Sequence, residues 1–208
     1  KLGLPIGGTV FAEVAIFSGV GLVMSKYPSL VIASHQAAMN FSNLMYAFPL
    51  SISSAMAIII SYEFGARRMD AVKSYSKLGR LTALGFSIFT LFFLYFLRYD
   101  LAELYGREPD FLRMTAIFMT YSLFFQVADV FAAPLQGILR GYKDTKVPFY
   151  LGVLTYWGIT FPVGFLLEKV TGLGPYSYWI GLIASLIVSG LCYQWRLNRI
   201  VKRYESQL

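Results

Sequence analysis

The sequence predicts an all-α membrane protein with six transmembrane helices, and two observations support this. Of the 208 residues, 57% are hydrophobic and only 14% are charged, whereas soluble proteins are nearer half apolar and a quarter charged. The apolar residues also gather in long blocks, and about 20 consecutive apolar residues span the hydrocarbon core as a helix. Barrel strands would instead be about ten residues long with alternating apolar side chains.

Six apolar blocks define the expected spans. Blocks of this length are helices because a chain in lipid must satisfy its backbone hydrogen bonds within the segment. The expected spans are residues 4–25, 31–62, 79–97, 114–139, 147–167 and 176–195. The second is too long for a perpendicular span, so we expect it to tilt, bend at Pro49 or project from the membrane. The connections are short, and residues 1–208 therefore form a single transmembrane lobe.

The positions of the basic residues predict the orientation. If both ends lie in the cytoplasm, the cytoplasmic side collects most of the 18 lysines and arginines, and every loop obeys the positive-inside bias. The exceptions on the outer side are Lys26, Arg98, Arg107, Arg113 and Lys169. We therefore expect a multi-pass protein of the cytoplasmic membrane with both ends of this segment inside. The same bias explains the net charge of +7 without a nucleic-acid partner.

Two carboxylates lie deep inside apolar blocks. Glu13 is about 9 residues, or roughly 14 Å, into the first span, and Asp129 is about 10 residues, or roughly 15 Å, from the end of the fourth. Both depths are measured from the cytoplasmic side, so the two acids lie near the bilayer midplane. An ionised carboxylate there costs on the order of 2.5 kcal/mol or more, and no lysine or arginine lies at that depth.

Three states satisfy that energetic condition. Each acid is protonated, hydrated in a cavity, or paired with a cation that comes and goes. A protonated acid that hydrogen-bonds between helices is the structural alternative, but an ionisable residue inside a membrane is functional by default. Two acids at matched depth favour a shared cation site.

Polar residues form a stripe on each of two spans. Spacings of three, four and seven residues place side chains on one helix face. The fourth span carries Ser122, Gln126, Asp129, Gln136 and Arg140, and the second carries Gln36, Asn40, Asn43, Ser51 and Ser54. Packing between helices accounts for some such stripes, but Asp129 favours a cavity. We expect the cavity to be lined by Gln36, Asn40, Asn43, Ser122, Gln126 and Gln136.

Catalytic and metal-binding patterns are missing from the sequence. One cysteine, Cys192, and one histidine, His35, are too few for a zinc or haem site. There is no HExxH, GxSxG or phosphate-binding glycine loop. His35 lies near the outer end of the second span, where a structural hydrogen bond suits it. We therefore expect neither an enzyme nor a cofactor.

Several motifs resemble those of MATE (multidrug and toxic compound extrusion) transporters. The segment from Leu2 to Gly7, followed by Phe11, Ala12 and Glu13, resembles the seventh helix of that family. The likeness continues through Ala33-Ser34-His35-Gln36, Asn40, Pro49-Leu50-Ser51, Leu139-Arg140-Gly141-Tyr142-Lys143-Asp144-Thr145, Pro162-Val163-Gly164 and Trp179-Ile180-Gly181-Leu182. These motifs extend over nearly the whole chain in the family's order.

The resemblance implies a fold and a function. The family has twelve helices in two six-helix lobes with alternating access, so this chain resembles the second lobe, with the N-terminal lobe absent. In the NorM-like branch, a Glu in the seventh helix and an Asp in the tenth help to bind the coupling cation, and these roles map onto Glu13 and Asp129. The expected function is one half of an antiporter, coupled to Na⁺ or H⁺, that exports small cationic and aromatic compounds across the bilayer.

Two alternatives are open at this point. A flippase for lipid-linked saccharides, from the same superfamily, would hold a diphosphate and would be expected to carry arginines near midplane depth, where this sequence has none. A non-transporting membrane enzyme or assembly subunit is a different class. The enzyme would need a nucleophile, base or metal, and an assembly subunit does not explain two unpaired acids at the midplane.

Overall fold

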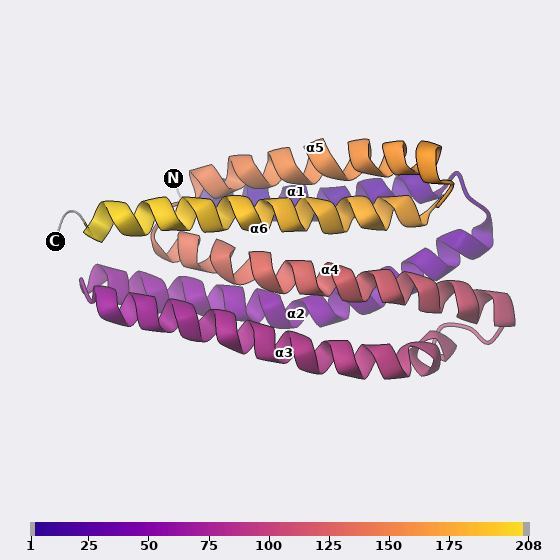
Figure 1. Ribbon diagram of the computed structural model, residues 1–208, viewed down its shortest axis with the longest axis horizontal. Coiled ribbons are helices and arrows are strands. Elements are labelled where there is room, and N and C mark those ends of the chain that lie inside the picture. Colours follow the sequence, from indigo (N-terminus) through magenta and orange to yellow (C-terminus); the bar gives the residue numbers. More distant parts are fainter. Residues whose placement is uncertain (1–2, 206–208) are drawn as a thin grey trace.

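The computed structural model describes residues 3–205, and each predicted span forms a helix within that range (Figure 1). The helices are α1 (Gly3–Met24), α2 (Ser29–Gly65), α3 (Met69–Glu103), α4 (Pro109–Gly141), α5 (Lys146–Thr171) and α6 (Tyr176–Glu205). All six are long and apolar enough to cross a membrane. The predicted fold class is confirmed. Lys1, which the charge pattern assigned to the cytoplasmic side, lies outside the described residues.

Several helices are longer than the apolar blocks that predicted them. α3 begins at Met69 rather than residue 79, and α6 ends at Glu205 rather than residue 195. These extensions carry charged residues, so they are invisible to a search for apolar blocks, yet their backbones continue the helical hydrogen bonding. The connection between α2 and α3, expected over residues 63–78, is consequently a turn of residues 66–68. α2 continues through Pro49 as one element of 37 residues.

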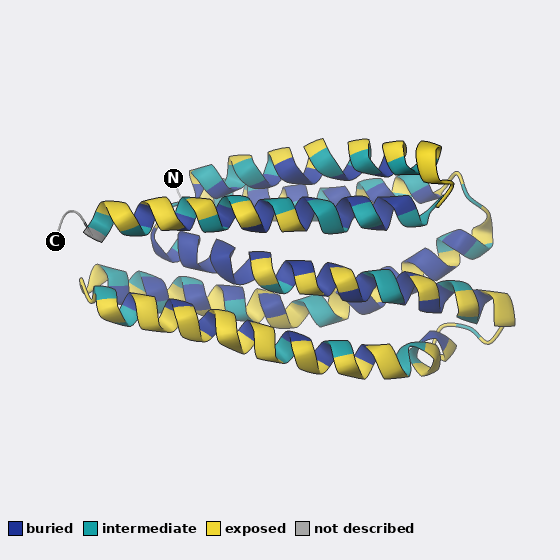
Figure 2. Cartoon of the chain, viewed as in Figure 1, coloured by how far each residue is buried: buried dark blue, intermediate teal, exposed yellow. Residues whose placement is uncertain are grey.

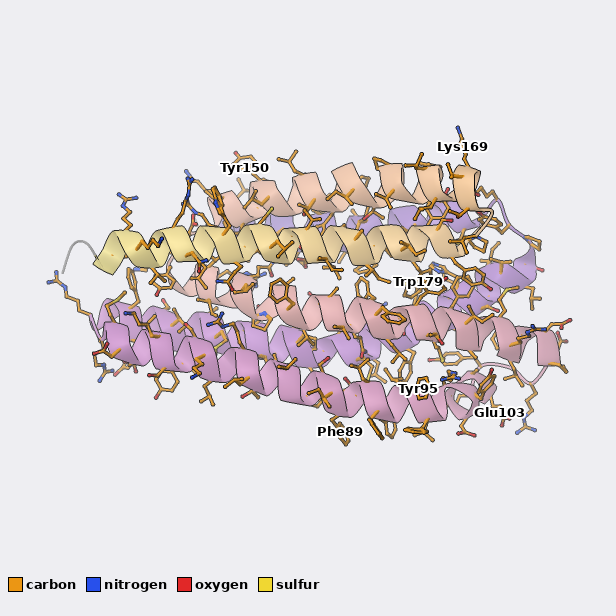
Figure 3. All side chains as sticks on the ribbon, viewed as in Figure 1. Phe89, Tyr95, Glu103, Tyr150, Lys169 and Trp179 are labelled. Carbon is orange, nitrogen blue, oxygen red and sulfur yellow. The ribbon has the colours of Figure 1, made fainter. Side chains whose placement is uncertain are left out.

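α4 is the central helix of the bundle. It packs against α2, α3 and α6, while α5 packs against α6 and α1 (Figure 1). Figure 2 shows α4 largely buried, whereas the outer faces of α3 and α5 are exposed along much of their length. The side chains of Phe89 and Tyr95 project outward from α3, and Trp179 lies between α6 and α4 (Figure 3). Exposed aromatic rows of this kind suit a surface covered by lipid.

Two glycines allow the helices to approach closely. A Cβ on Gly137 of α4 would lie 2.2 Å from the carbonyl oxygen of Ser53 in α2, and one on Gly181 of α6 would lie 2.3 Å from that of Thr160 in α5. Only glycine fits at either place. Small residues at helix contacts are how membrane bundles gain packing energy without a hydrophobic driving force. These contacts fix α2 on α4 and α5 on α6.

α1 and α2 are less closely joined to each other. They are neighbours in the chain, yet α1 packs mainly on α5 and α2 mainly on α4. The two helices therefore diverge from the turn that joins them (Figure 1). The first and last helices start and end at the same end of the bundle, as six antiparallel spans require (Figure 1).

Candidate functional site

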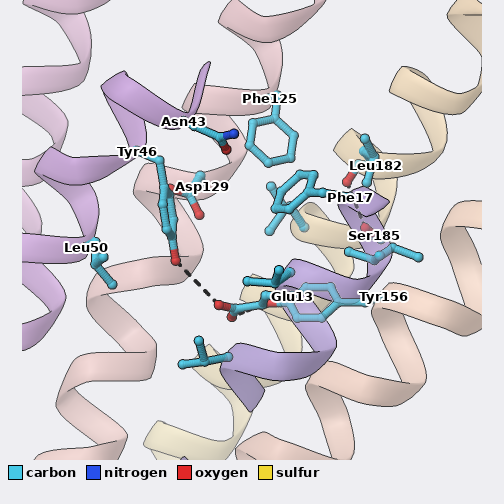
Figure 4. Close-up of a pocket in the computed structure, with 14 residues that line it drawn as sticks. Glu13, Phe17, Asn43, Tyr46, Leu50, Phe125, Asp129, Tyr156, Leu182 and Ser185 are labelled. Atoms are coloured by element: carbon cyan, nitrogen blue, oxygen red, sulfur yellow. Dashed lines mark hydrogen bonds between the residues drawn. The ribbon is translucent and has the colours of Figure 1, made fainter. Parts of the chain in front are cut away.

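A cavity of about 180 Å³ lies where α1 and α2 separate (Figure 4). Its mouth is formed by exposed residues of these two helices, including Val14 and Asn43. Its floor comes from α4, α5 and α6. The lining residues are Val10, Glu13, Val14, Ile16, Phe17, Asn43, Tyr46, Leu50, Phe125, Asp129, Tyr156, Leu182, Ser185 and Leu186. Both deep carboxylates line this one cavity.

Glu13 is held by donors from three different helices. Its Oε1 accepts hydrogen bonds from Gln136 Nε2 of α4 at 2.9 Å and from the Tyr156 hydroxyl of α5 at 3.1 Å. Its Oε2 accepts a longer one, 3.4 Å, from the Tyr46 hydroxyl of α2. Figure 4 shows Tyr46 and Tyr156 approaching the carboxylate from opposite sides. These donors fix the position of the carboxylate at the edge of the cavity.

Asp129 has a different environment. Only 6% of its surface is exposed, and none of the side chains within residues 3–205 donates a hydrogen bond to it. It faces the cavity beside Tyr46 (Figure 4). A buried carboxylate without donors carries a large desolvation penalty, which a proton, ordered water or a bound cation would offset. The cavity is large enough for these, since one water molecule occupies about 30 Å³ of liquid.

Gln136 connects Glu13 to a positive charge. The guanidinium of Arg140 donates a hydrogen bond to Gln136 Oε1, and Gln136 Nε2 donates to Glu13. Helical side chains tilt toward the N-terminus of their helix, so Arg140, near the end of α4, reaches back toward the membrane interior. The sequence indicated no basic residue at the depth of Glu13. In the structure, however, Arg140 is connected to Glu13 through the side-chain amide of Gln136.

The other polar residues expected at the cavity are distributed differently. Asn43 lines the cavity, and it also lines a separate hollow that contains Gln36 and Asn40, toward the α3–α4 turn. Ser122 is fully buried and donates to Met119 O of its own helix. Gln126 is buried, and neither of its amide atoms has a partner among the described residues. Neither Ser122 nor Gln126 lines the cavity.

Sequence reasoning missed the two tyrosines that hold Glu13. Tyr46 follows Asn43 by three residues, so the polar stripe of α2 contained a signal for it. Tyr156 is one of several aromatic residues of α5, and nothing in its spacing distinguishes it. His35, by contrast, accepts a hydrogen bond from Trp179 Nε1 at 3.1 Å, which is the structural role its position suggested.

A metal centre of the usual composition is not formed by the residues that the structure describes. No three His, Cys, Asp or Glu side chains gather within residues 3–205. Around the two carboxylates, however, the cavity presents neutral oxygen atoms from Asn43, Tyr46 and Ser185. Carboxylate, carbonyl and hydroxyl oxygens are ligands for hard cations. The cavity therefore suits a proton or a weakly held hard cation better than a tightly bound transition metal.

Comparison with known proteins identifies the family. The model of the MatE family matches residues 5–166. The chain belongs to the MatE family. Its members are transporters rather than enzymes, which agrees with the resemblance read from the motifs.

Relatives and solved structures extend the comparison. The chain is 68% identical over 206 residues to the probable multidrug resistance protein NorM of Streptococcus pneumoniae strain R6, covering 99% of this chain and 46% of that protein. For the protein of the same description from Bacillus subtilis strain 168, the identity is 46%, covering 100% of this chain and 46% of that protein. The crystal structure of the eukaryotic MATE transporter AtDTX14 superposes with a TM-score of 0.87 at 17% identity, covering 94% of this chain and 44% of that one.

These coverages bear on what the chain contains. The chain spans about half the length of the curated relatives it matches. That proportion is consistent with one six-helix lobe of a MatE protein whose other lobe is outside this chain. At 17% identity, the solved structure demonstrates the fold of the lobe alone.

Proposed function

We propose that this chain is the second lobe of a multidrug exporter, in which Glu13 and Asp129 bind the coupling cation, Na⁺ or H⁺. The observation that carries the proposal is that the two deep carboxylates line one cavity, with neutral oxygens around them and with no donor to Asp129 among the side chains that the structure describes. A site that must take up and release a cation needs an acid whose charge no fixed partner cancels.

The size of the cavity supports a division between the ion and the exported compound. About 180 Å³ holds a hydrated cation, whereas sites for drug-sized molecules are about 300–1,000 Å³. The mouth between α1 and α2, with the exposed amides of Gln36, Asn40 and Asn43 along α2, would face the first lobe. The exported compound would bind between the lobes, with its cationic or aromatic end near Phe17, Phe125 and the two acids.

Export would follow from competition. When the cation gradient loads the carboxylates, the positive charge of the bound compound loses its partner and the compound is released. The lobe would lie in the cytoplasmic membrane with both its ends in the cytoplasm, in agreement with the positive-inside bias. A flippase for an anionic lipid diphosphate fits less well, because the two carboxylates would repel its phosphates.

The test is transport by the full-length protein in proteoliposomes. Ethidium, a fluorescent aromatic cation, would be exported under an imposed Na⁺ gradient or an imposed pH gradient, and the effective gradient identifies the coupling ion. We expect Glu13→Gln and Asp129→Asn each to abolish gradient-driven export.

Matched controls are available on the exposed ends of the bundle. Glu103→Gln and Asp110→Asn make the same chemical changes at exposed positions of α3 and α4, and they should transport normally (Figure 3 shows Glu103). Unchanged export by the two cavity variants, at normal expression, would sink the proposal.

A further inference from the structure

An exposed arginine connects two helices at the end of the bundle where α3 begins and α6 ends. α4 lies between these two helices and packs against both (Figure 1). Arg80 of α3 donates a hydrogen bond from Nη1 to Gln194 Oε1 of α6 at 3.3 Å, and another from Nε to Ser76 O of α3 at 3.2 Å. Both acceptors are neutral, and no ion pair among residues 3–205 includes Arg80. The charge of this guanidinium is therefore not cancelled by a protein carboxylate that the structure describes.

The direction of the two helices places further polar groups beside this contact. α3 starts and α6 finishes at the same end, so the two are antiparallel (Figure 1). Because three or four residues along a helix return to the same face, Lys77, which precedes Arg80, lies level with Asn198, which follows Gln194. Both Lys77 and Asn198 are exposed, and Gln194 Nε2 donates to Asn198 Oδ1 at 2.7 Å. This surface thus presents an ammonium, a guanidinium and an amide to one anion.

One helical turn further into the bundle, the same faces of α3 and α6 are apolar. Leu84 of α3 and Leu191 of α6 are 53% and 57% exposed. Phe131 of α4 is also exposed, and it lies against α6 at this level, because a Cβ on Gly190 would be 2.5 Å from its ring. The surface therefore changes from basic to apolar within about 5.4 Å, the rise of one turn.

A tryptophan marks the depth of this change. Trp195 directly follows Gln194, is half exposed, and has the guanidinium of Arg199 at 4.1 Å from the centre of its ring. Tryptophan concentrates where lipid headgroups meet the hydrocarbon region. The phosphates of the surrounding lipids consequently lie level with Arg80 and Lys77, and their acyl chains lie level with the exposed leucines.

We infer that α3 and α6 form a binding site for an anionic phospholipid. Arg80 and Lys77 bind its phosphate, Asn198 donates a hydrogen bond to it, and the acyl chains lie on the apolar surface beneath. The planar guanidinium of arginine matches the geometry of a phosphate. Basic pockets between membrane helices recognise anionic headgroups, whereas a zwitterionic lipid carries an ammonium group that the two basic residues repel. The inference goes beyond the proposed function and does not depend on which ion is coupled.

Native mass spectrometry of the full-length protein tests this inference. The protein, purified in detergent, is mixed with equal amounts of phosphatidylglycerol and phosphatidylcholine that have the same acyl chains, and the ratio of the two bound lipids is measured. We expect the wild type to retain mainly phosphatidylglycerol. Lys77→Gln and Arg80→Gln should each lower that ratio about fivefold, the factor for one basic residue near an anionic surface. Arg80→Lys keeps the charge and should retain most of the preference.

Lys146→Gln is the matched control. It removes an exposed lysine at the same end of the bundle, but at the start of α5, which packs on α6 and α1 rather than on α3. Its lipid ratio should equal that of the wild type. A wild type without a preference would overturn the inference. So would Lys77→Gln and Arg80→Gln proteins that purify normally and keep the wild-type ratio, because the basic residues would then serve only to orient the chain.

A soluble phosphate separates lipid from free anion. Glycerol 3-phosphate carries the same phosphate without acyl chains, and an excess of it should leave phosphatidylglycerol bound. Displacement of the lipid would show that the site takes a free phosphate, and the assignment to a phospholipid would fail. The proposed function is tested separately, since normal export by Glu13→Gln and Asp129→Asn would remove the cation site and leave the lipid ratio unchanged.

Discussion

Asp129 and Glu168 are both acids in a membrane lobe, and the protein treats them in opposite ways. Glu168, near the end of α5, accepts hydrogen bonds from Lys26 and from Tyr178, each at 2.6 Å to Oε2, and a third from Tyr27 to Oε1. Asp129 has no such donor among the described residues and faces a cavity instead. Glu168 thus has a fixed cation beside it, whereas Asp129 has none among the described residues and, in the function proposed above, binds an exchangeable one.

The cluster around Glu168 also has a clear mechanical role. Lys26 and Tyr27 lie in the turn between α1 and α2, and Tyr178 lies in the first turn of α6. Their shared carboxylate therefore ties the α1–α2 turn to α5 and α6. The two helices that separate around the cavity are joined here, at one end. The pair of helices is thus fastened at the end where their turn lies, and the cavity lies further along, where they have diverged.

A lysine placed in the cavity would give Asp129 a fixed cation like that of Glu168. We expect this change to have the largest effect on export. Asn43→Lys puts an ammonium group at the mouth, where it would pair with Asp129 as Lys26 pairs with Glu168. Gradient-driven ethidium export should fall on the order of 100-fold, because an ion pair at about 4 Å in partly buried surroundings is worth a few kcal/mol. The measurement is export by the full-length protein in proteoliposomes.

Asn43→Leu is the control for that variant, because it removes the amide without adding a charge. It should retain gradient-driven export at a reduced level. If Asn43→Lys protein of normal yield still responded to the gradient like the wild type, the absence of a fixed cation near Asp129 would have no functional meaning.

Removing the acid at the fastened end should have a moderate effect on stability and none on coupling. Glu168→Gln loses the ion pair with Lys26 and weakens two tyrosine hydrogen bonds. Because 43% of the Lys26 side chain is exposed, we expect a loss of only about 1 kcal/mol, or a melting temperature about 1 °C lower in a protein about twice as long as this chain. Thermal unfolding of the full-length protein in detergent measures it.

Lys169→Gln, one residue further along, is the matched control. Its side chain projects away from the bundle (Figure 3) and has no partner among the described residues. Equal melting temperatures for the two variants would show that the cluster adds nothing. A changed ion dependence of export in Glu168→Gln would contradict the separation of the two acids.

The sequence was a better guide to the helices and the acids than to their surroundings. Apolar blocks predicted six spans because hydropathy directly reports contact with lipid, but it could not find the polar ends of α3 and α6. Glu13 and Asp129 stood out because charge at such depth is costly. Their donors did not, since which side chain of α5 or α4 meets Glu13 depends on how the helices are rotated against each other.

The stripe on α4 illustrates that limit. Ser122, Gln126 and Gln136 share a face by spacing, yet only Gln136 bonds to Glu13. Ser122 bonds to its own backbone, as short hydroxyl side chains in helices often do. A stripe predicts a face, whereas the cavity occupies only the part of that face left uncovered where α1 and α2 separate.

The pH dependence of the stability that the cluster around Glu168 contributes should be the smallest of these effects. Partial burial alone would lower the pKa of Lys26, but hydrogen bonds to Glu168 and Tyr178 outweigh it and raise that pKa above the usual value for lysine. Burial and the hydrogen bond to Glu168 raise the pKa of Tyr27 as well, so it remains a donor. A raised lysine pKa means that the contribution of Lys26 is complete below about pH 10.4, the unfolded value, and is lost as the pH rises through the folded pKa. Burial alone would raise the pKa of Glu168, but the hydrogen bonds to it lower the pKa of that carboxyl to about 2, so its contribution is lost only in strong acid. The difference in melting temperature between wild type and Glu168→Gln should therefore be constant from pH 7 to pH 9. A melting difference that shrank between pH 7 and pH 9 would mean that the ammonium of Lys26 is not held by the cluster, and that the fastened end is as exchangeable as the cavity.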